Sequence, residues 1–370
     1  MSSIVTITGT EERTQLRDTI RQFVRERTPM TRVRETLDSA EPYDTDVWRV
    51  LGLDFGLAGL VMPEEFGGVG AAYADLSVAL TELGAGLVPT PLLATIVAGE
   101  VLLALDDDAH ALLPGLASGK QVGTLAATEP TPGARSWIPE HPTVTLTGGS
   151  RLHGEKVAVL NGADADVLLV QAHDGDEVVI CVVDAAADGL ARIRSRSIDP
   201  TAAVARLRFD GVSATRLPGD AAAALGRARD VANLVISAQQ LGAMAACVKM
   251  TSEYAKLRVA FGQPIGAFQA VKHPLANLHT AWELGNAALL EAQRCADEDP
   301  GQLTTAAAVA RYQLSPAYLR AAADTMQLHG GIGYTWEHDA HLYYKNAAAG
   351  RLLCGTPTEQ LDIIASQLGL

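Results

Sequence analysis

The spacing of apolar residues changes twice along the chain, and this change limits its fold more than any other feature. Up to about Gly119, apolar residues recur every three or four positions, which is typical of helices that bury one face. From about Val122 the repeat shortens to two, as in strands, and from about Ala221 the helical spacing returns. This order of helices, strands and helices predicts an α+β multidomain protein.

The three parts of the pattern predict three domains. We expect an N-terminal all-helical domain at residues 1–120, a middle β-barrel or sandwich domain at 121–218, and a C-terminal four-helix bundle at 219–370. The middle part has the size of one small barrel or sandwich. Within the C-terminal part, long helices are predicted over 221–260, 274–297, 303–328 and 339–353.

The charge and cysteine content exclude several classes of protein. With 29 basic and 43 acidic residues the formal charge is −14, and the sequence has no basic stripe that would bind nucleic acid phosphates. The four cysteines are widely spaced without a CxxC pair, which favours reduced thiols in the cytoplasm. The opening residues lack the apolar run of a secretory signal, and no later stretch is apolar for 18 residues without a charge, so we expect no membrane contact.

Two short motifs resemble functional sites without meeting their requirements. Gly115–Lys120 is one residue short of a phosphate-binding loop, and Gln121 stands where a magnesium-binding Ser or Thr is needed. His338 and His341 lie three residues apart, but no third ligand follows at a suitable spacing. We therefore expect no metal site.

Two separated strings of residues form the strongest signal. Residues 254–273 read YAKLRVAFGQPIGAFQAVKH, and residues 327–338 read QLHGGIGYTWEH. Together they resemble the acyl-CoA dehydrogenase superfamily, whose signature is R-x-x-F-G-x-x-I-x-x-x-Q followed about 60 residues later by Q-x-x-G-G-x-G. Because both motifs, their spacing and the order of helices and strands agree, the resemblance covers essentially the whole chain.

The resemblance implies a flavoprotein that removes hydrogen from the α and β carbons of an acyl-CoA thioester, with FAD as the hydride acceptor. Two identical or homologous subunits would share each FAD, and an electron-transfer flavoprotein or a similar acceptor would take the electrons. Arg258 would bind the pyrophosphate with its two-pronged guanidinium. The other implied contacts in these strings are Phe261 and Gln269 on the adenine half and, across the dimer interface, Gln327, Gly330 and Gly331.

The middle segment carries weaker parts of the same resemblance. Thr128 lies in a T-E-P string whose hydroxyl and amides face the flavin ring in the family, but the loop that follows departs from the family's G-A-G-S-D. Residues 154–162 resemble the strand G-x-K-x-W-I-T-N-G, with Ala158 in place of the Trp and Leu160 in place of the Thr. Thr356 matches the last residue of the family's Glu-Gly-Thr and is a further implied FAD contact.

The carboxylate that removes the α-proton in this family is missing from both of its known positions. One position is occupied by Cys354 and the other, on the helix before the Arg-Phe-Gly motif, by Ala232. Asp230 is a weak substitute, because two residues correspond to about 200° around a helix, which is the wrong face. Cys354 follows two leucines, and apolar surroundings raise the pKa of a thiol. The sequence therefore identifies no catalytic residue.

Three functions remain open at this point. The chain is an active acyl-CoA dehydrogenase, a base-lacking partner subunit of a heteromeric one, or a divergent biosynthetic enzyme that acts on a carrier-bound acyl substrate. Residues 331–345 resemble the actinobacterial branch that forms heterotetramers in steroid side-chain breakdown. This resemblance favours a subunit that helps to bind FAD in a homo- or hetero-oligomer.

Overall fold

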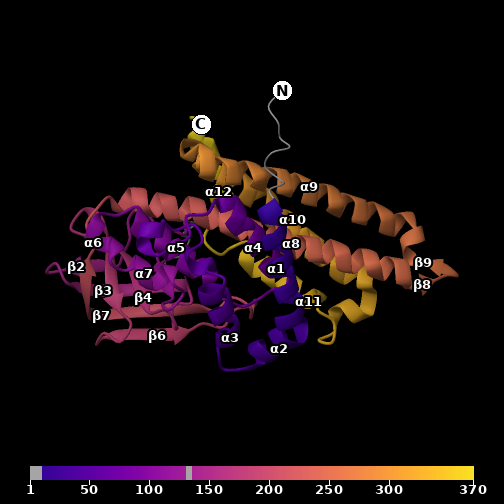
Figure 1. The fold of residues 1–370 in the computed structure, drawn as a ribbon, viewed down its shortest axis with the longest axis horizontal. Helices are drawn as coiled ribbons and strands as arrows, with labels where there is room; N and C mark the ends of the chain where they lie inside the picture. Colours follow the sequence, from indigo (N-terminus) through magenta and orange to yellow (C-terminus); the bar gives the residue numbers. More distant parts are fainter. Residues whose placement is uncertain (1–10, 131–135) are drawn as a thin grey trace.

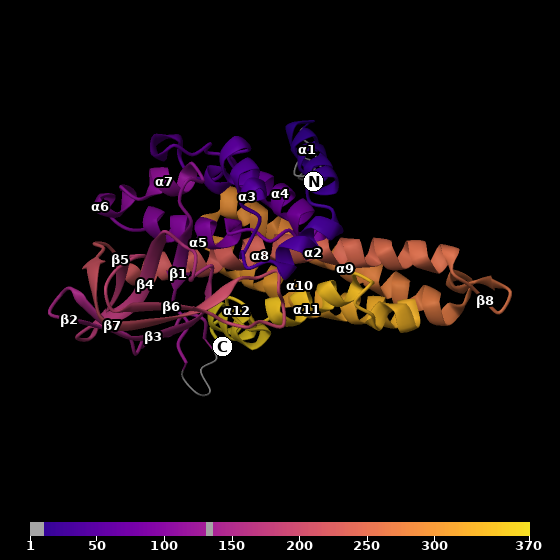
Figure 2. The same ribbon diagram turned by 90° about the horizontal axis from the view of Figure 1, so that it is seen from below.

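A computed structural model describes residues 11–130 and 136–370. Helices form the N-terminal part, a β-sheet follows, and long helices make up the rest (Figure 1). The predicted α+β class is confirmed. The sheet lies at one end of the long C-terminal helices, and a two-stranded hairpin lies at the other end (Figure 2).

Two of the N-terminal helices, α4 and α5, pack against the longest helix, α8 (Ala221–Leu257). Of these, α5 is buried at every residue from Leu92 to Leu102, as expected of a helix that is apolar on all sides. The crossing of α4 and α8 depends on glycine, because a Cβ on Gly242 would lie 1.8 Å from the carbonyl oxygen of Thr81. The elements are α1 (Glu11–Arg27), α2 (Met30–Asp38), α3 (Thr45–Trp48), η2 (Arg49–Asp54), η3 (Leu57–Gly59), η4 (Glu64–Phe66), α4 (Tyr73–Ala85), α5 (Leu92–Leu103), α6 (Asp107–His110) and α7 (Leu113–Ala117).

The middle sheet closes on itself as a small barrel. Its strands pair in the order β1-β4-β2-β3-β7-β5, and β5 pairs again with β4, so that the strands from β4 to β5 form a closed ring. Strand β1 pairs with β4 outside this ring. Along β7, Ala205, Leu207 and Phe209 are buried while Arg206 and Arg208 are exposed, so the predicted two-residue repeat is observed. The strands are β1 (Gly123–Ala126), β2 (Thr145–Thr147), β3 (Arg151–Leu160), β4 (Val167–Asp174), β5 (Glu177–Asp184), β6 (Leu190–Arg194) and β7 (Val204–Arg216).

A buried ion pair joins β3 to the segment that follows β1. The Lys156 ammonium lies 2.7 Å from the Glu129 carboxylate and also donates to the carbonyl of Ala127. Glu129 in turn accepts from the backbone and hydroxyl of Thr143. Burial lowers the pKa of Lys156 to about 8, although the contact with Glu129 opposes this effect. The pair fixes the backbone on which Thr128 lies.

The C-terminal helices form the long half of the molecule. They are α8 (Ala221–Leu257), α9 (Gln269–Glu298), α10 (Leu303–His329), α11 (Ala340–Gly350) and α12 (Pro357–Gln367), with the hairpin strands β8 (Val259–Ala260) and β9 (Gln263–Pro264) after α8. Helix α9 begins five residues before the predicted start at Pro274. The proline lacks only its own N–H, so it removes one hydrogen bond near the helix start without ending the helix.

Helix α8 is the central helix of the molecule. Asp220 caps its start by accepting a hydrogen bond from the backbone of Ala223 at 3.0 Å. The helix is long and apolar enough to cross a membrane, but 78% of its most apolar window is buried inside the protein. Its apolar character is that of a core helix, because helices pack on several sides of it.

Candidate functional site

The residues predicted to bind FAD fall into two groups, one beyond the C-terminal end of α8 and the other beside the middle of this helix. One group, which we call the tip group, surrounds the β8–β9 hairpin and the end of α10 (Figure 2). The other, which we call the sheet group, lies beside β3 and the start of α12. The tip group is Arg258, Phe261, Gln269, Gln327, Gly330 and Gly331, and the sheet group is Thr128 and Thr356 with the neighbouring Ala158, Leu160 and Cys354.

The R-x-x-F-G motif forms the hairpin at the tip. Phe261 and Gly262 are its two loop residues, and both have positive φ, 51° and 82°, as a tight hairpin turn requires. Because of this turn the Phe261 ring points away from the core and is 94% exposed. Its nearest aromatic neighbour is Phe268, at 6.1 Å between centroids, directly before Gln269 at the start of α9.

The second motif lies against the first. The Tyr254 ring stacks on His329 at 4.4 Å between centroids, and its hydroxyl donates to the His329 carbonyl at 3.3 Å. Gly330 ends α10 with φ of 65°, and a Cβ on Gly330 or Gly331 would meet no atom within 4 Å. The two strings recognised in the sequence therefore form one open surface. Its exposed large apolar residues are Leu257, Val259, Phe261, Ile332, Tyr334 and Trp336.

The tip group and the sheet group cannot line the same site within one chain. Thr356 bonds Glu359, which lines a cavity together with Arg229 near the start of α8. Arg258 follows the other end of this helix. Gln360, which follows Glu359, accepts from Asn233 of α8, and at a rise of 1.5 Å per residue Asn233 lies roughly 38 Å along the helix from Arg258. An FAD that contacts both groups must therefore lie between two subunits.

Three residues of the sheet group, Ala158, Leu160 and Cys354, line a cavity that is almost filled. Thr128 lies beside β3, where its carbonyl accepts from the backbone of Val157 at 2.9 Å. Ala158 and Leu160 from β3, Trp137 and Cys354 line a space of only about 10 Å³. A site for a small molecule of ligand size typically measures about 300–1,000 Å³.

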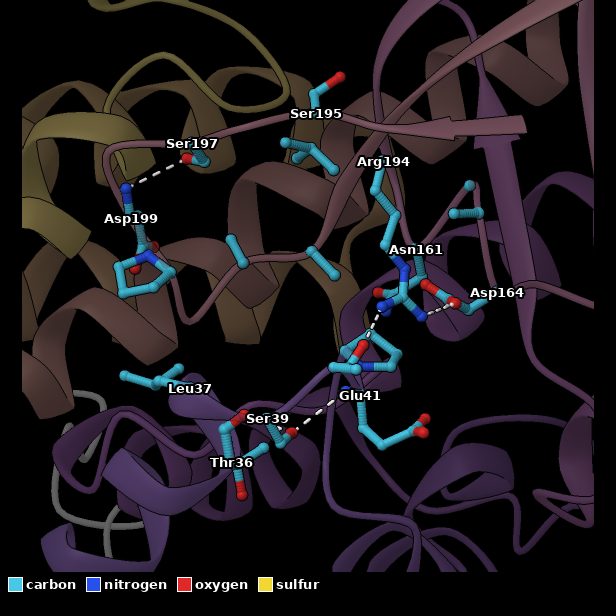
Figure 3. Close-up of a pocket in the computed structure, with 18 residues that line it drawn as sticks. Thr36, Leu37, Ser39, Glu41, Asn161, Asp164, Arg194, Ser195, Ser197 and Asp199 are labelled. Carbon is cyan, nitrogen blue, oxygen red and sulfur yellow. Dashed lines mark hydrogen bonds and ion pairs between the residues drawn. The ribbon is translucent and has the colours of Figure 1, made fainter. Parts of the chain in front are cut away.

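A second, somewhat larger space continues on the other side of Leu160. About 90 Å³ lies between Leu160, Gly350 and Leu353, and about 170 Å³ lies further out, between the end of α2 and the barrel. Figure 3 shows this outer cavity, in which the Arg194 side chain pairs with Asp164 at 2.6 Å and bonds the Ala40 carbonyl. Both spaces are smaller than a typical ligand pocket.

The two positions predicted for the base, Cys354 and Ala232, are buried and carry no carboxylate. Burial raises the pKa of the Cys354 thiol to about 12, so the thiol is neutral, and Ala232 is fully buried in α8. Asp230 accepts a hydrogen bond from Thr304 at 2.5 Å and pairs with Arg229 at 2.9 Å. Of the described residues that line the cavity beside Cys354, none is acidic.

Glu359, which was not predicted from the sequence, contacts the backbone of Trp137 at this cavity. Glu359 bonds Ser136 and Trp137, and burial raises its pKa above the usual range. It also lines a cavity of about 640 Å³ with Arg229 and Asp362. The pattern Thr356-Pro-Thr-Glu359 is a readable helix-start signal, since each side chain bonds the other residue's backbone. The long-range contact with Ser136 and Trp137 has no such local signal.

Comparison with known proteins decides the family. Residues 10–120 match the model of the acyl-CoA dehydrogenase N-terminal domain, and residues 222–369 match that of the C-terminal domain. Acyl-CoA dehydrogenase IpdE2 of Mycobacterium tuberculosis is 34% identical over 366 residues, which cover 98% of this chain and 99% of the relative. The chain belongs to the acyl-CoA dehydrogenase family.

Solved structures of this family include heteromeric members. A variant of the Tcur3481-Tcur3483 steroid ACAD has a TM-score of 0.87 at 31% identity, covering 97% of this chain and 99% of that one. The ChsE4-ChsE5 complex from Mycobacterium tuberculosis has a TM-score of 0.88 at 26% identity, covering 99% of both chains. Both names join two gene products.

Acyl-CoA dehydrogenases are FAD flavoproteins, and the two groups differ in how well they suit this cofactor. The tip group suits it, because Arg258 is exposed and open space lies in front of Gly330 and Gly331. The sheet group does not suit the flavin ring, because about 10 Å³ remains beside Ala158 and Cys354.

Proposed function

We propose that this acyl-CoA dehydrogenase family member is the base-lacking subunit of a heteromeric enzyme. Its tip group would hold the adenine and pyrophosphate part of an FAD whose ring lies in a homologous sister subunit. The difference between the open tip and the closed ring pocket carries this proposal. The neutral Cys354 and the buried Ala232 support it, because they occupy the family's base positions.

The chemistry then divides between the two subunits. Removal of an α-proton beside a thioester requires a positioned base, which the sister subunit supplies. FAD, when bound, accepts the β-hydride, and an electron-transfer flavoprotein or a similar protein takes the electrons. This chain contributes an exposed cation at Arg258 and a backbone that a ligand can approach closely at Gly330 and Gly331.

We further propose that the substrate is the CoA thioester of a steroid-derived acid. Support comes from the 31% identical structure, which is named as a steroid ACAD. A bulky substrate would bind in the sister subunit, because none of the spaces around Leu160 in this chain reaches the size of a ligand pocket.

The test compares the chain alone with the chain co-expressed with a base-carrying family member encoded next to it. We expect a stable complex with FAD, measured by flavin absorbance after gel filtration, that is bleached anaerobically by steroid-derived acyl-CoA. The chain alone should hold little FAD. If the chain alone forms an FAD-loaded oligomer that acyl-CoA bleaches, the proposal is wrong.

A further inference from the structure

Trp137 is buried beside Cys354. Its side chain lines the small cavity together with Ala158 and Leu160, and the residue is only 8% exposed. At position 158 the family signature has a tryptophan, and the alanine found here leaves room for the indole of Trp137. The remaining space of about 10 Å³ is at the lower limit for a single water molecule.

Glu359 holds the backbone of Trp137 in place. The Trp137 amide donates to both oxygens of the Glu359 carboxylate, at 3.2 Å each. The Ser136 hydroxyl lies 3.0 Å from Oε1 of the same group. Hydrogen bonds to an ionised acceptor are stronger than neutral ones, so one side chain fixes two consecutive residues of this segment.

The start of α12 gives Glu359 a fixed position. The Glu359 amide donates to the Thr356 hydroxyl at 3.2 Å, and the Thr356 amide donates back to the Glu359 carboxylate at 3.4 Å. The next residue, Gln360, is buried and accepts from Asn233 of α8 at 2.8 Å. Cys354 lies two residues before Thr356, so the cavity wall and the residue that holds Trp137 belong to one rigid segment.

The geometry points to Trp137 as a plug, held by the Glu359 carboxylate, that keeps planar ring ligands out of this chain's own ring pocket. The inference rests on the proposed function, since a subunit that lends its tip to a sister's FAD does not need a ring pocket of its own. It goes beyond the missing base, because restoring a carboxylate at Cys354 would leave the pocket closed.

Lumiflavin tests the plug separately from the proposed function. It carries the flavin ring without the phosphates, so it cannot use the tip group. We expect no saturable quenching of lumiflavin fluorescence by the full-length wild-type chain and saturable quenching by Trp137→Ala. Trp137→Phe, which keeps an aromatic ring, should stay closed.

Thiol labelling of Cys354 gives a second measurement. Iodoacetamide followed by mass spectrometry should label Cys354 at least tenfold faster in Trp137→Ala than in wild type, and lumiflavin should slow that labelling. Cys181, buried in the barrel, is the internal reference. Glu359→Gln should also speed the labelling, and the exposed Glu65→Gln should not, which covers the case that Trp137→Ala fails to fold.

The outcomes separate the two proposals. Equal Cys354 labelling in wild type and variants, or a Trp137→Ala chain that binds no lumiflavin, overturns the plug and leaves the heteromeric assignment standing. Lumiflavin binding by the wild-type chain overturns the plug as well. Failure of the proposed function is recognised by a different result, an FAD-loaded chain without a sister subunit that acyl-CoA bleaches.

Discussion

The two groups of residues predicted to bind FAD differ in their surroundings, because the tip group is open and the sheet group is closed. At the tip, Arg258 is exposed and 94% of the Phe261 surface is accessible. At the sheet end, Trp137 and Cys354 are buried around about 10 Å³. A cluster of exposed large apolar residues, such as the one at the tip, is typical of a surface that contacts another molecule. A filled cavity instead stabilises the folded chain itself.

Because one group is open and the other is closed, we expect them to affect different properties of the protein. The residues at the sheet end contact one another, so changes there should alter the free energy of unfolding. Those at the tip face outwards, so changes there should alter FAD binding in the assembled enzyme.

Lys156→Met should cause the largest effect. The substitution leaves the Glu129 carboxylate buried without its cation, and breaking a buried pair from one side costs about 3–5 kcal/mol. Denaturant unfolding of the purified chain measures this loss. The double variant Lys156→Met with Glu129→Gln should recover part of it, because no unpaired charge remains. A single variant as stable as wild type would contradict the role assigned to this pair.

Arg258→Ala should weaken FAD binding by the assembly without changing the stability of the chain. Loss of hydrogen bonds from a charged group costs about 1.5–3 kcal/mol, which corresponds to about a 10- to 150-fold weaker Kd. Titration of the apo-assembly with FAD measures the Kd. The exposed Arg196→Ala is the matched control and should bind FAD like wild type. Unchanged affinity in Arg258→Ala would remove the tip group from the cofactor site.

Arg258→Lys refines the same prediction. Lysine keeps the charge but loses the two-pronged geometry of the guanidinium, so its affinity should lie between those of the alanine variant and wild type. An affinity equal to wild type would show that Arg258 acts only as a point charge.

Much of the fold and of the tip could be predicted from the sequence, because both depend on local patterns. The change in spacing near Val122 and Ala221 marks the start of the strands and of the long helices. The motifs around Arg258 and Gln327 contain every residue of the family signature, so their positions could be predicted from the sequence. The roles of these residues toward FAD remain predictions.

The closed pocket could not be predicted, because it depends on residues far apart in the sequence. Ala158 replaces the tryptophan of the family strand, but no neighbouring residue in the sequence shows that Trp137 lies beside it in the structure. The hydrogen bonds between Trp137 and Glu359 join residues 222 positions apart. Only the helix start at Thr356 and Glu359 had a local signal. The sequence predicts that the base is absent, and the structure adds that the space beside Cys354 is small.

The smallest expected effect concerns the pH dependence at the tip. His329 is buried between Tyr254 and His338, with its Nδ1 2.7 Å from the Thr325 carbonyl, and burial lowers its pKa. The unfolded chain, with an ordinary histidine pKa of about 6.5, binds more protons below that pH than the folded chain. This contribution to stability is therefore complete above about pH 6.5 and is lost as the pH falls below it.

His329→Gln should reduce this pH dependence. Unfolding free energies at pH 7 and pH 5.5 should differ less in the variant than in wild type, while the exposed His279→Gln, on α9, should behave like wild type. A remaining slope is expected from His341, whose pKa burial also lowers. If His329→Gln and His279→Gln change the slope equally, His329 does not couple the tip to pH. The pH dependence of the unfolding free energy would then not distinguish the tip from the rest of the chain.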